Sequence, residues 1–369
     1  MMKRFAWVIF LVTVLLFIAW QMLPRRVEVE RKYLERRRLD TPHALTGEGV
    51  ITPENATQMR LIEQRGWGAI NDAAWAPDSH SLALATTTSI RLVDASNLNL
   101  LGEIPSEAPV RAVACSPDGS LVAGVVEGKG IALWTVGRAS FDRLLEVPGV
   151  EPRVWARGLQ FSSDGRWLAI IWQAILYVWD VQTGRLQVNL KPQVTEGQDP
   201  RLVSFLPGKG RILYADNVRL YTLDVETGST EWAAPFAHPS DSIWAVNAVG
   251  DRMALGSCEH LYLFDAWQDT PRATFDLGDT CLKQVVFSED GQQLATLAGS
   301  GYIYLIAQDG SVLTFEPSGQ RPNYSRATVP LRFSPDGQSL AWVAKPWAML
   351  LYRTADGSLA QILRSPWAA

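Results

Sequence analysis

The chain has 369 residues, of which 47% are hydrophobic and 20% charged, the proportions of an ordinary folded protein. Its net charge of −4 is the sum of two parts of opposite sign. Residues 1–40 hold nine Lys/Arg and four Asp/Glu, whereas residues 41–369 hold 25 Lys/Arg and 34 Asp/Glu. The acidic body disfavours nucleic-acid binding, and the basic start indicates that the two parts face different surroundings.

The first predicted element is a membrane-spanning helix at residues 5–23, FAWVIFLVTVLLFIAWQML. These 19 residues carry no charge and approach the roughly 20 that a helix needs to cross a bilayer. Trp7 and Trp20 stand near its ends, where aromatic rings prefer the interface. A cleaved signal peptide is the alternative, but its apolar region is usually shorter and ends in small residues, whereas WQMLPRR stands here. We therefore predict an uncleaved signal-anchor over residues 1–24.

A basic segment, RRVEVERKYLERRR at residues 25–38, opens a predicted juxtamembrane linker over residues 25–56. It has seven basic residues against two before the anchor, which favours a cytoplasmic location for the domain after it. Single N-terminal anchors with a short basic start often export the domain that they precede, so a periplasmic or other extracytoplasmic location stays open. The segment either contacts anionic lipid, at about 1 kcal/mol per basic residue, or forms a solvated helix, since interleaved Glu28, Glu30 and Glu35 dilute its charge.

The remaining chain, residues 57–366, repeats a short pattern of a turn, an apolar run and an alternating strand. The turns include SPDGS, SSDGR, SEDGQ and SPDGQ, and the reference residues that directly precede the seven turns stand at intervals of 40, 46, 44, 43, 39 and 46. Short alternating runs between Gly/Asp turns indicate strands, and four strands per period of this length predict propeller blades. The reference residues are Trp75, Cys115, Phe161, Phe205, Ala248, Phe287 and Phe333.

This repeat resembles the WD-repeat β-propeller family in its period and turn text. The family's Gly-His pair is absent, so its Asp–His–Ser/Thr–Trp hydrogen-bond network is missing or degraded, and TolB-like and YVTN-like propellers are close alternatives. The predicted fold is all-β, a seven-bladed β-propeller of four-stranded antiparallel blades preceded by one transmembrane helix. The family's Trp-Asp pair is matched fully by Trp179-Asp180 and in part by Trp134, Asp94, Asp224 and Asp265.

Closure of the ring has two candidate strands. TQMRLIEQ at residues 57–64 has the pattern of an outer strand placed before blade one, where it would join the last blade. GSLAQIL at residues 357–363 can fill the same slot. The two cannot both be the fourth strand of the seventh blade, and the sequence does not choose between them.

The candidate binding site is found by counting back four residues from each reference position. In WD-repeat propellers this position lies at the start of the innermost strand, by the mouth of the central channel, so the resemblance implies a contact ring on the top face. Four of the seven residues are basic, and arginine suits bidentate contacts with carboxylates. We predict that the ring binds an acidic peptide or protein segment; the alternative is pairing with acidic loops of adjacent blades. The positions hold Asn71, Arg111, Arg157, Arg201, Trp244, Lys283 and Val329.

The three cysteines show no metal-binding spacing. Cys258 is expected in the turn between the second and third strands of blade five, and Cys281 just before the first strand of blade six. Both places lie on the same face of a propeller, so a disulfide is geometrically possible, and it would argue for an oxidising compartment. Cys115 aligns with core phenylalanines and is expected to be a buried thiol.

No nucleophile elbow, P-loop, H-E-x-x-H or C-x-x-C-H motif occurs, so no catalytic residue, metal or cofactor is predicted. LDVETGSTEW at residues 223–232 resembles the Trp-docking motif of quinoprotein propellers, but that family repeats it in successive blades. We expect a membrane-anchored scaffold that binds a protein or peptide. The alternatives are a propeller enzyme or envelope-assembly factor with its site in the central channel, and a structural subunit of a membrane complex that uses its blade sides.

Overall fold

The computed structural model describes residues 68–138, 142–149, 156–191, 201–206, 210–215, 219–235, 243–246, 251–265, 268, 270–315, 331–345 and 348–364. Every regular element in these ranges is a β-strand. A helix long and apolar enough to cross a bilayer is not found within these ranges. The predicted anchor at residues 5–23, the basic segment 25–38 and the candidate closing strand 57–64 lie outside the described residues.

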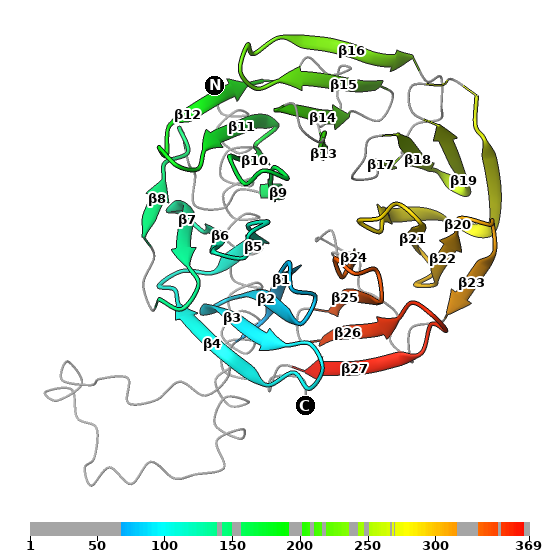
Figure 1. The fold of residues 1–369 in the computed structure, drawn as a ribbon, viewed down its shortest axis with the longest axis horizontal. Helices are drawn as coiled ribbons and strands as arrows, with labels where there is room; N and C mark the ends of the chain where they lie inside the picture. Colours follow the sequence, from blue (N-terminus) through cyan, green and yellow to red (C-terminus); the bar gives the residue numbers. More distant parts are fainter. Residues whose placement is uncertain are drawn as a thin grey trace, which may run out of the picture. The chain divides into compact units, whose positions relative to one another are not determined.

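Residues from 68 onward form seven antiparallel blades around one axis, a seven-bladed β-propeller (Figure 1). Blade one consists of β1 (Ile70–Trp75), β2 (Ser81–Thr86), β3 (Ser89–Asp94) and β4 (Leu100–Pro105). Blade two consists of β5 (Val110–Cys115), β6 (Leu121–Val126), β7 (Gly130–Thr135) and β8 (Arg143–Leu145). Blade three consists of β9 (Ala156–Phe161), β10 (Trp167–Trp172), β11 (Ile175–Asp180) and β12 (Leu186–Leu190).

The second half of the ring has the same order from the innermost to the outermost strand. Blade four consists of β13 (Arg201–Leu206), β14 (Arg211–Ala215), β15 (Arg219–Asp224) and β16 (Thr230–Pro235). Blade five consists of β17 (Ile243–Val246), β18 (Arg252–Gly256), β19 (Cys258–Asp265) and the first part of β20 (Ala273–Phe287). Blade six consists of the last part of β20, β21 (Gln293–Ala298), β22 (Ile303–Ala307) and β23 (Val312–Phe315). Blade seven consists of β24 (Leu331–Phe333), β25 (Ser339–Lys345), β26 (Ala348–Arg353) and β27 (Leu359–Arg364).

The strand β20 departs from the simple repeat because it serves two blades. Its residue Ala273 pairs with Leu263 of β19, and its residue Phe287 pairs with Leu294 of β21. Blades five and six are therefore joined in one seven-stranded sheet, whereas each other blade is a separate four-stranded sheet.

The Ser-x-Asp-Gly turns between first and second strands share one hydrogen-bond pattern. In blade two, the Ser116 hydroxyl donates to Asp118 Oδ1 at 2.5 Å and accepts from the Leu121 N–H at 2.9 Å. The Ser116 hydroxyl also holds the pKa of Asp118 below its usual range. Gly119 has a φ of 72°, a left-handed conformation that glycine adopts without steric cost. Equivalent serine–aspartate pairs are Ser162–Asp164, Ser288–Asp290 and Ser334–Asp336.

These turns also pack against one another around the ring. A Cβ atom on Gly119 would lie 3.2 Å from Pro77 Cγ of blade one, so this close approach favours glycine. In the same way, Pro117 of blade two lies beside Gly165 of blade three. The repeated turn therefore closes each hairpin and also contributes to contact between neighbouring blades.

The ring closes where blade seven meets blade one. The Trp75 indole N–H donates to the Arg332 carbonyl oxygen at 3.2 Å, and the Asp336 N–H donates to the Ser79 hydroxyl at 3.0 Å. The Gln361 amide donates to the Ser96 carbonyl oxygen at 2.8 Å. The outer strand of blade seven is β27, so the candidate GSLAQIL fills the fourth-strand slot for which residues 57–64 were the other candidate.

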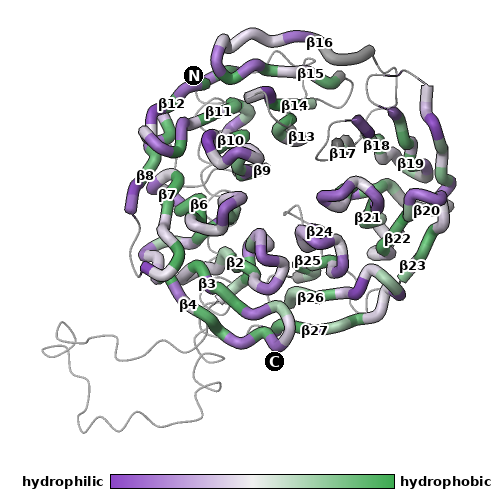
Figure 2. Tube along the Cα trace, in the orientation of Figure 1, coloured by the Kyte–Doolittle hydropathy of each residue, from purple (hydrophilic) through white to green (hydrophobic). Residues whose placement is uncertain are grey.

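The core consists of apolar side chains packed between blades. Trp134 of blade two, Trp179 of blade three and Trp342 of blade seven are each at most 2% exposed. Trp179 packs in a cluster with Leu133 and Leu168, and thus between blades two and three. Along the outer wall, β23 and β27 carry hydrophobic residues over much of their length (Figure 2).

Candidate functional site

The six candidate residues that are described lie on the innermost strands of blades one to six, near the end of the ring at which these strands begin. We call this end the top face and the opposite end, with the Ser-x-Asp-Gly turns, the bottom face. Val329 lies outside the described residues, as do the side chains of Arg157, Arg201 and Trp244. The placements are Asn71 in β1, Arg111 in β5, Arg157 in β9, Arg201 in β13, Trp244 in β17 and Lys283 in β20.

Several innermost strands carry an extra residue at or next to the candidate position. In β1 the register shifts between Ile70 and Asp72, which leaves Asn71 outside the regular pairing. In β20 it shifts between Leu282 and Gln284, which leaves Lys283 outside it. Such bulges re-aim a side chain away from the regular alternation of a strand. Counting back four residues from the reference residue therefore finds the bulged position of the innermost strand in blades one and six.

The candidate side chains that are described differ in the hydrogen bonds and ion pairs that they already form. The Asn71 amide donates to the Val110 carbonyl oxygen of blade two at 2.7 Å, which is a contact between blades. Arg111 forms a 2.6 Å ion pair with Glu127 in the turn between β6 and β7. Lys283 is exposed and has no ion pair with any other described residue.

The Arg111 pair differs from the expected alternative to binding. That alternative pairs each cation with an acidic loop of an adjacent blade, whereas Glu127 belongs to the same blade as Arg111. The Arg111 side chain remains 44% exposed, and exposed ion pairs stabilise a fold by only about 0–1 kcal/mol. An acidic partner can therefore compete with Glu127 for the guanidinium at small cost.

Sequence reasoning missed a buried carboxylate beside this position. Asp72 is 7% exposed and stands directly after Asn71 in β1. Its Oδ1 accepts from the Ala73 N–H at 2.9 Å, and its Oδ2 accepts from the Val113 N–H of blade two at 3.1 Å. Burial raises the pKa of Asp72, and the positive charge of Arg332 opposes that rise.

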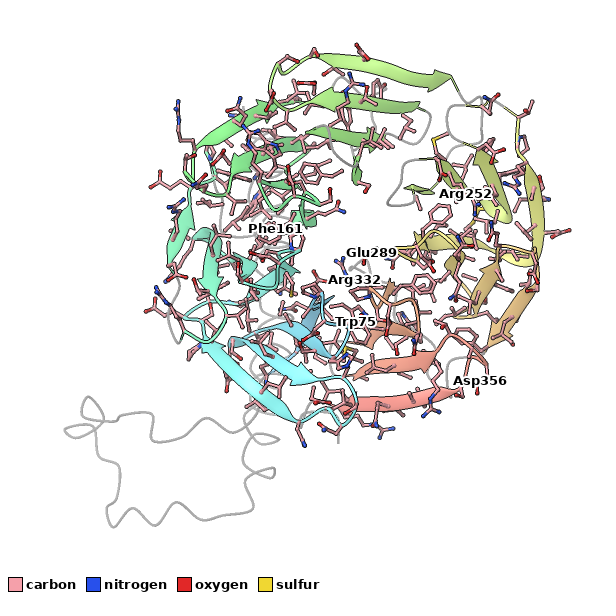
Figure 3. The ribbon with its side chains drawn as sticks, viewed as in Figure 1. Trp75, Phe161, Arg252, Glu289, Arg332 and Asp356 are labelled. Atoms are coloured by element: carbon pink, nitrogen blue, oxygen red, sulfur yellow. A yellow bond between two sulfur atoms is a disulfide. The ribbon has the colours of Figure 1, made fainter. Side chains whose placement is uncertain are left out.

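Arg332 of β24 is the cation that faces Asp72 from blade seven. The Arg332 Nη2 atom lies 3.5 Å from Asp72 Oδ1, and the arginine side chain is 38% exposed. Figure 3 shows Arg332 at the inner end of blade seven, beside Trp75 of blade one. The only sequence signal for Arg332 was a charged residue directly before the reference position Phe333.

Cys258 and Cys281 are joined by a disulfide. Cys258 begins β19 in blade five, and Cys281 stands in β20 where that strand passes from blade five to blade six. The Leu282 N–H donates to the Ser257 carbonyl oxygen at 3.1 Å beside the bridge. The disulfide therefore fastens the crossing strand to the top of blade five, two residues before Lys283.

The remaining cysteine has the properties of a packing residue. Cys115 is a free thiol that is half-buried beside the cluster that contains Trp134 and Val122, so the expected burial is only partial. Burial raises the pKa of the Cys115 thiol to about 12, so the thiol stays protonated at neutral pH and is a poor nucleophile. Within the described ranges, no three His, Cys, Asp or Glu side chains converge as a metal site would require.

A shallow depression lies away from the candidate residues, at the turns of blades five to seven. It has a volume of about 860 Å³, and its lining includes Arg272, Asp309 and Thr354. Arg272 lies 3.3 Å from Asp265, and Asp309 accepts from the Ser311 N–H at 2.9 Å. These side chains are engaged in local turn contacts, so the depression offers no separate reactive group.

Comparison with known proteins does not assign the chain to a family. A scan against protein-family models finds no match, and a search of curated proteins finds no significant match. The WD-repeat resemblance therefore rests on the repeat text, while the seven-bladed propeller rests on the strand topology.

Proposed function

We propose that this protein is a membrane-anchored scaffold whose propeller binds an acidic protein segment at its top face. The observation that carries the proposal is the recurrence of cations near the start of innermost strands. Arg111, Arg157, Arg201 and Lys283 supply such a residue in blades two, three, four and six, in a body of the chain that is acidic. Repeated cations around one end of a ring favour a negatively charged partner.

The repeated residue of the bottom face is an aspartate rather than a cation, which supports the choice of the top face. Its first turns carry aspartates in blades one, two, three, six and seven, each engaged by local hydroxyl or backbone N–H groups. In blade one, for example, Asp78 Oδ1 accepts from the His80 N–H at 2.8 Å. These aspartates oppose the approach of an acidic partner, although the same face also carries exposed arginines, among them Arg138, Arg185 and Arg353. The remaining aspartates of this set are Asp118, Asp164, Asp290 and Asp336.

The compartment is part of the proposal. Disulfides persist in oxidising compartments and are rare in the cytosol, so the Cys258–Cys281 bridge supports an extracytoplasmic propeller. The excess of basic residues after the predicted anchor favours the opposite side. We give the disulfide more weight because it concerns the folded domain itself, whereas the charge rule concerns a short flanking segment.

A structural subunit that uses its blade sides is the second candidate, and one observation favours it. Large apolar side chains are exposed on the outer strands of blades six, seven, one and two, where Leu144 of β8 is 38% exposed. Leu101 is 60% exposed, Leu100 47%, Val312 43% and Leu359 36%. Exposed apolar residues that gather on one side of a protein mark an interaction surface when they form a contiguous patch.

Replacing Arg111, Arg157 and Arg201 together by alanine is expected to abolish most capture of the partner from solubilised membranes. Three charge-assisted contacts at the centre of an interface would be lost together. The measurement is affinity purification coupled to quantitative mass spectrometry of the captured proteins. The matched control replaces Arg138, Arg185 and Arg353, three exposed arginines near the bottom face, by alanine and should capture as the wild type does. Unchanged capture by the first variant would refute the top-face site.

A further inference from the structure

The contact ring defined by sequence spacing has a gap where blade seven meets blade one. The spacing assigns Val329 to blade seven and Asn71 to blade one; neither carries a charge, and Val329 lies outside the described residues. The Asn71 amide is also engaged by the Val110 carbonyl oxygen. If the top face binds an acidic segment around the whole ring, a cation from another position among the described residues can serve blades seven and one.

Arg332 brings a positive charge to this gap. It stands three residues after position 329 in the chain, but its guanidinium reaches Asp72, the residue next to Asn71 on the neighbouring blade. The Arg332 carbonyl oxygen accepts from the Trp75 indole at 3.2 Å, which fixes the backbone of β24 against blade one. The side chain thus starts from a held backbone and extends toward the level of the contact ring.

The guanidinium of Arg332 is incompletely satisfied by the described part of the chain. Its Nε–H is buried and has no described acceptor. Its contact with Asp72 spans 3.5 Å, at the limit of hydrogen-bonding distance. Asp72 already accepts from two backbone N–H groups, of Ala73 and Val113. Arginine has five N–H donors, so Arg332 retains capacity for a further acceptor.

Exposure makes that capacity available to a partner. The Arg332 side chain is 38% exposed, whereas the Asp72 side chain is 10% exposed. A ligand that approaches this position meets the arginine before the carboxylate. Because Nε–H is buried, an oxyanion with two acceptor atoms would bind the Nη1 and Nη2 end of the guanidinium, and carboxylates match the planar guanidinium in this way.

We propose that Arg332 binds a carboxylate of the acidic partner segment and so supplies the missing cation of the contact ring at blades seven and one. This inference rests on the proposed function of the top face and adds a residue that the spacing of the repeat does not select. Asp72 weakens the binding of the same carboxylate. Its negative charge holds Arg332 in place and competes with the partner's carboxylate for it.

The test uses a fluorescein-labelled hexaglutamate peptide as the probe and measures its binding to the purified full chain by fluorescence anisotropy at low ionic strength. Arg332→Gln is expected to weaken binding about tenfold, because a charge-assisted contact is lost. Asp72→Asn is expected to strengthen binding about threefold, because the competing charge is removed while Arg332 stays. Arg138→Gln, a loss of the same charge near the bottom face, should change the dissociation constant less than twofold.

The direction of the Asp72→Asn effect separates a binding role from a structural one. If Arg332 only supports the contact between blades, removing Asp72 leaves peptide affinity unchanged or lowers it, and either result overturns the inference. Unchanged affinity in Arg332→Gln overturns it as well. Circular dichroism and thermal unfolding verify that each variant is folded. If Arg332→Gln does not fold, the double variant Asp72→Asn/Arg332→Gln replaces it, because this variant leaves no buried carboxylate unpaired. Its affinity for the peptide is compared with that of Asp72→Asn and should be about tenfold weaker.

The triple variant of Arg111, Arg157 and Arg201 distinguishes failure of this inference from failure of the proposed function. If the triple variant loses the peptide and Arg332→Gln retains it, the top-face proposal stands and the role of Arg332 is wrong. If Arg332→Gln loses the peptide and the triple variant retains it, the role of Arg332 stands and the ring proposal is wrong. Absence of peptide binding by the wild type overturns both.

Discussion

Replacing Cys258 and Cys281 together by serine should lower the free energy of unfolding by about 3 kcal/mol, because the bridge constrains the unfolded chain over a separation of 23 residues. Urea denaturation of the oxidised wild type and the variant measures the difference. Reduction with dithiothreitol should lower the stability of the wild type to that of the variant and leave the variant unchanged. Equal stability of oxidised and reduced wild type would contradict the expectation.

The same disulfide connects stability with the proposed compartment. Non-reducing mass spectrometry of protein purified from its source membranes should yield one peptide pair linked through Cys258 and Cys281. A free Cys115 should be alkylated in the unfolded protein without prior reduction. Finding both bridge cysteines as free thiols in freshly isolated material would contradict an oxidising location.

Replacing Trp179 by alanine should cost about 3–5 kcal/mol of unfolding free energy, because it empties a site between blades two and three. Trp179 is 1% exposed and packs with Leu133 and Leu168. Its ring also stacks on Tyr177, with 5.7 Å between ring centroids. The control Trp179→Phe retains an aromatic ring and should lose clearly less. Chemical denaturation of the three proteins measures both differences, and a loss below about 1 kcal/mol for Trp179→Ala would show that Trp179 is not a core residue.

Much of the propeller can be predicted from the sequence because its repeated residues act locally. Ser116 and Asp118 form a turn through contacts within six residues, so the same text in four blades gives the same hairpin. The apolar runs after these turns become buried second strands, as in β10, where all six residues are buried. The spacing of the repeated turns along the chain then gives the number of blades. The strand β20 was not predicted as continuous, because a shared strand depends on how two blades meet.

The candidate site could be predicted only in part. Counting back from the turn places Lys283 and Arg111 on innermost strands, because each of these strands runs into the turn and includes the position four residues before its reference residue. The contacts of these side chains cannot be obtained by counting. The pairing of Arg111 with Glu127 depends on a turn 16 residues away, and the approach of Arg332 to Asp72 depends on ring closure across 260 residues. Both contacts result from tertiary packing rather than from a local pattern.

The position of the disulfide was easier to predict from the sequence than the contacts of the candidate site. The sequence places Cys258 at a hairpin turn and Cys281 at a crossing between blades, and both features lie at the same end of any propeller. In the structure they pair directly across β19 and β20. Sequence alone could not decide the bond, because the distance between two positions on one face depends on the path of the crossing strand.

The central claim, that the partner binds the top face, is tested most directly by site-specific photo-crosslinking in intact cells. A benzoylphenylalanine is placed at Lys283 on the top face, at Asp356 in the turn before β27 and at Leu101 on the outer wall of blade one, all of which are exposed. A crosslinked partner is expected from position 283 and none from position 356 or 101. Crosslinks from position 101 alone would favour the blade sides, and crosslinks from position 356 alone would favour the bottom face; either result would contradict the top-face claim.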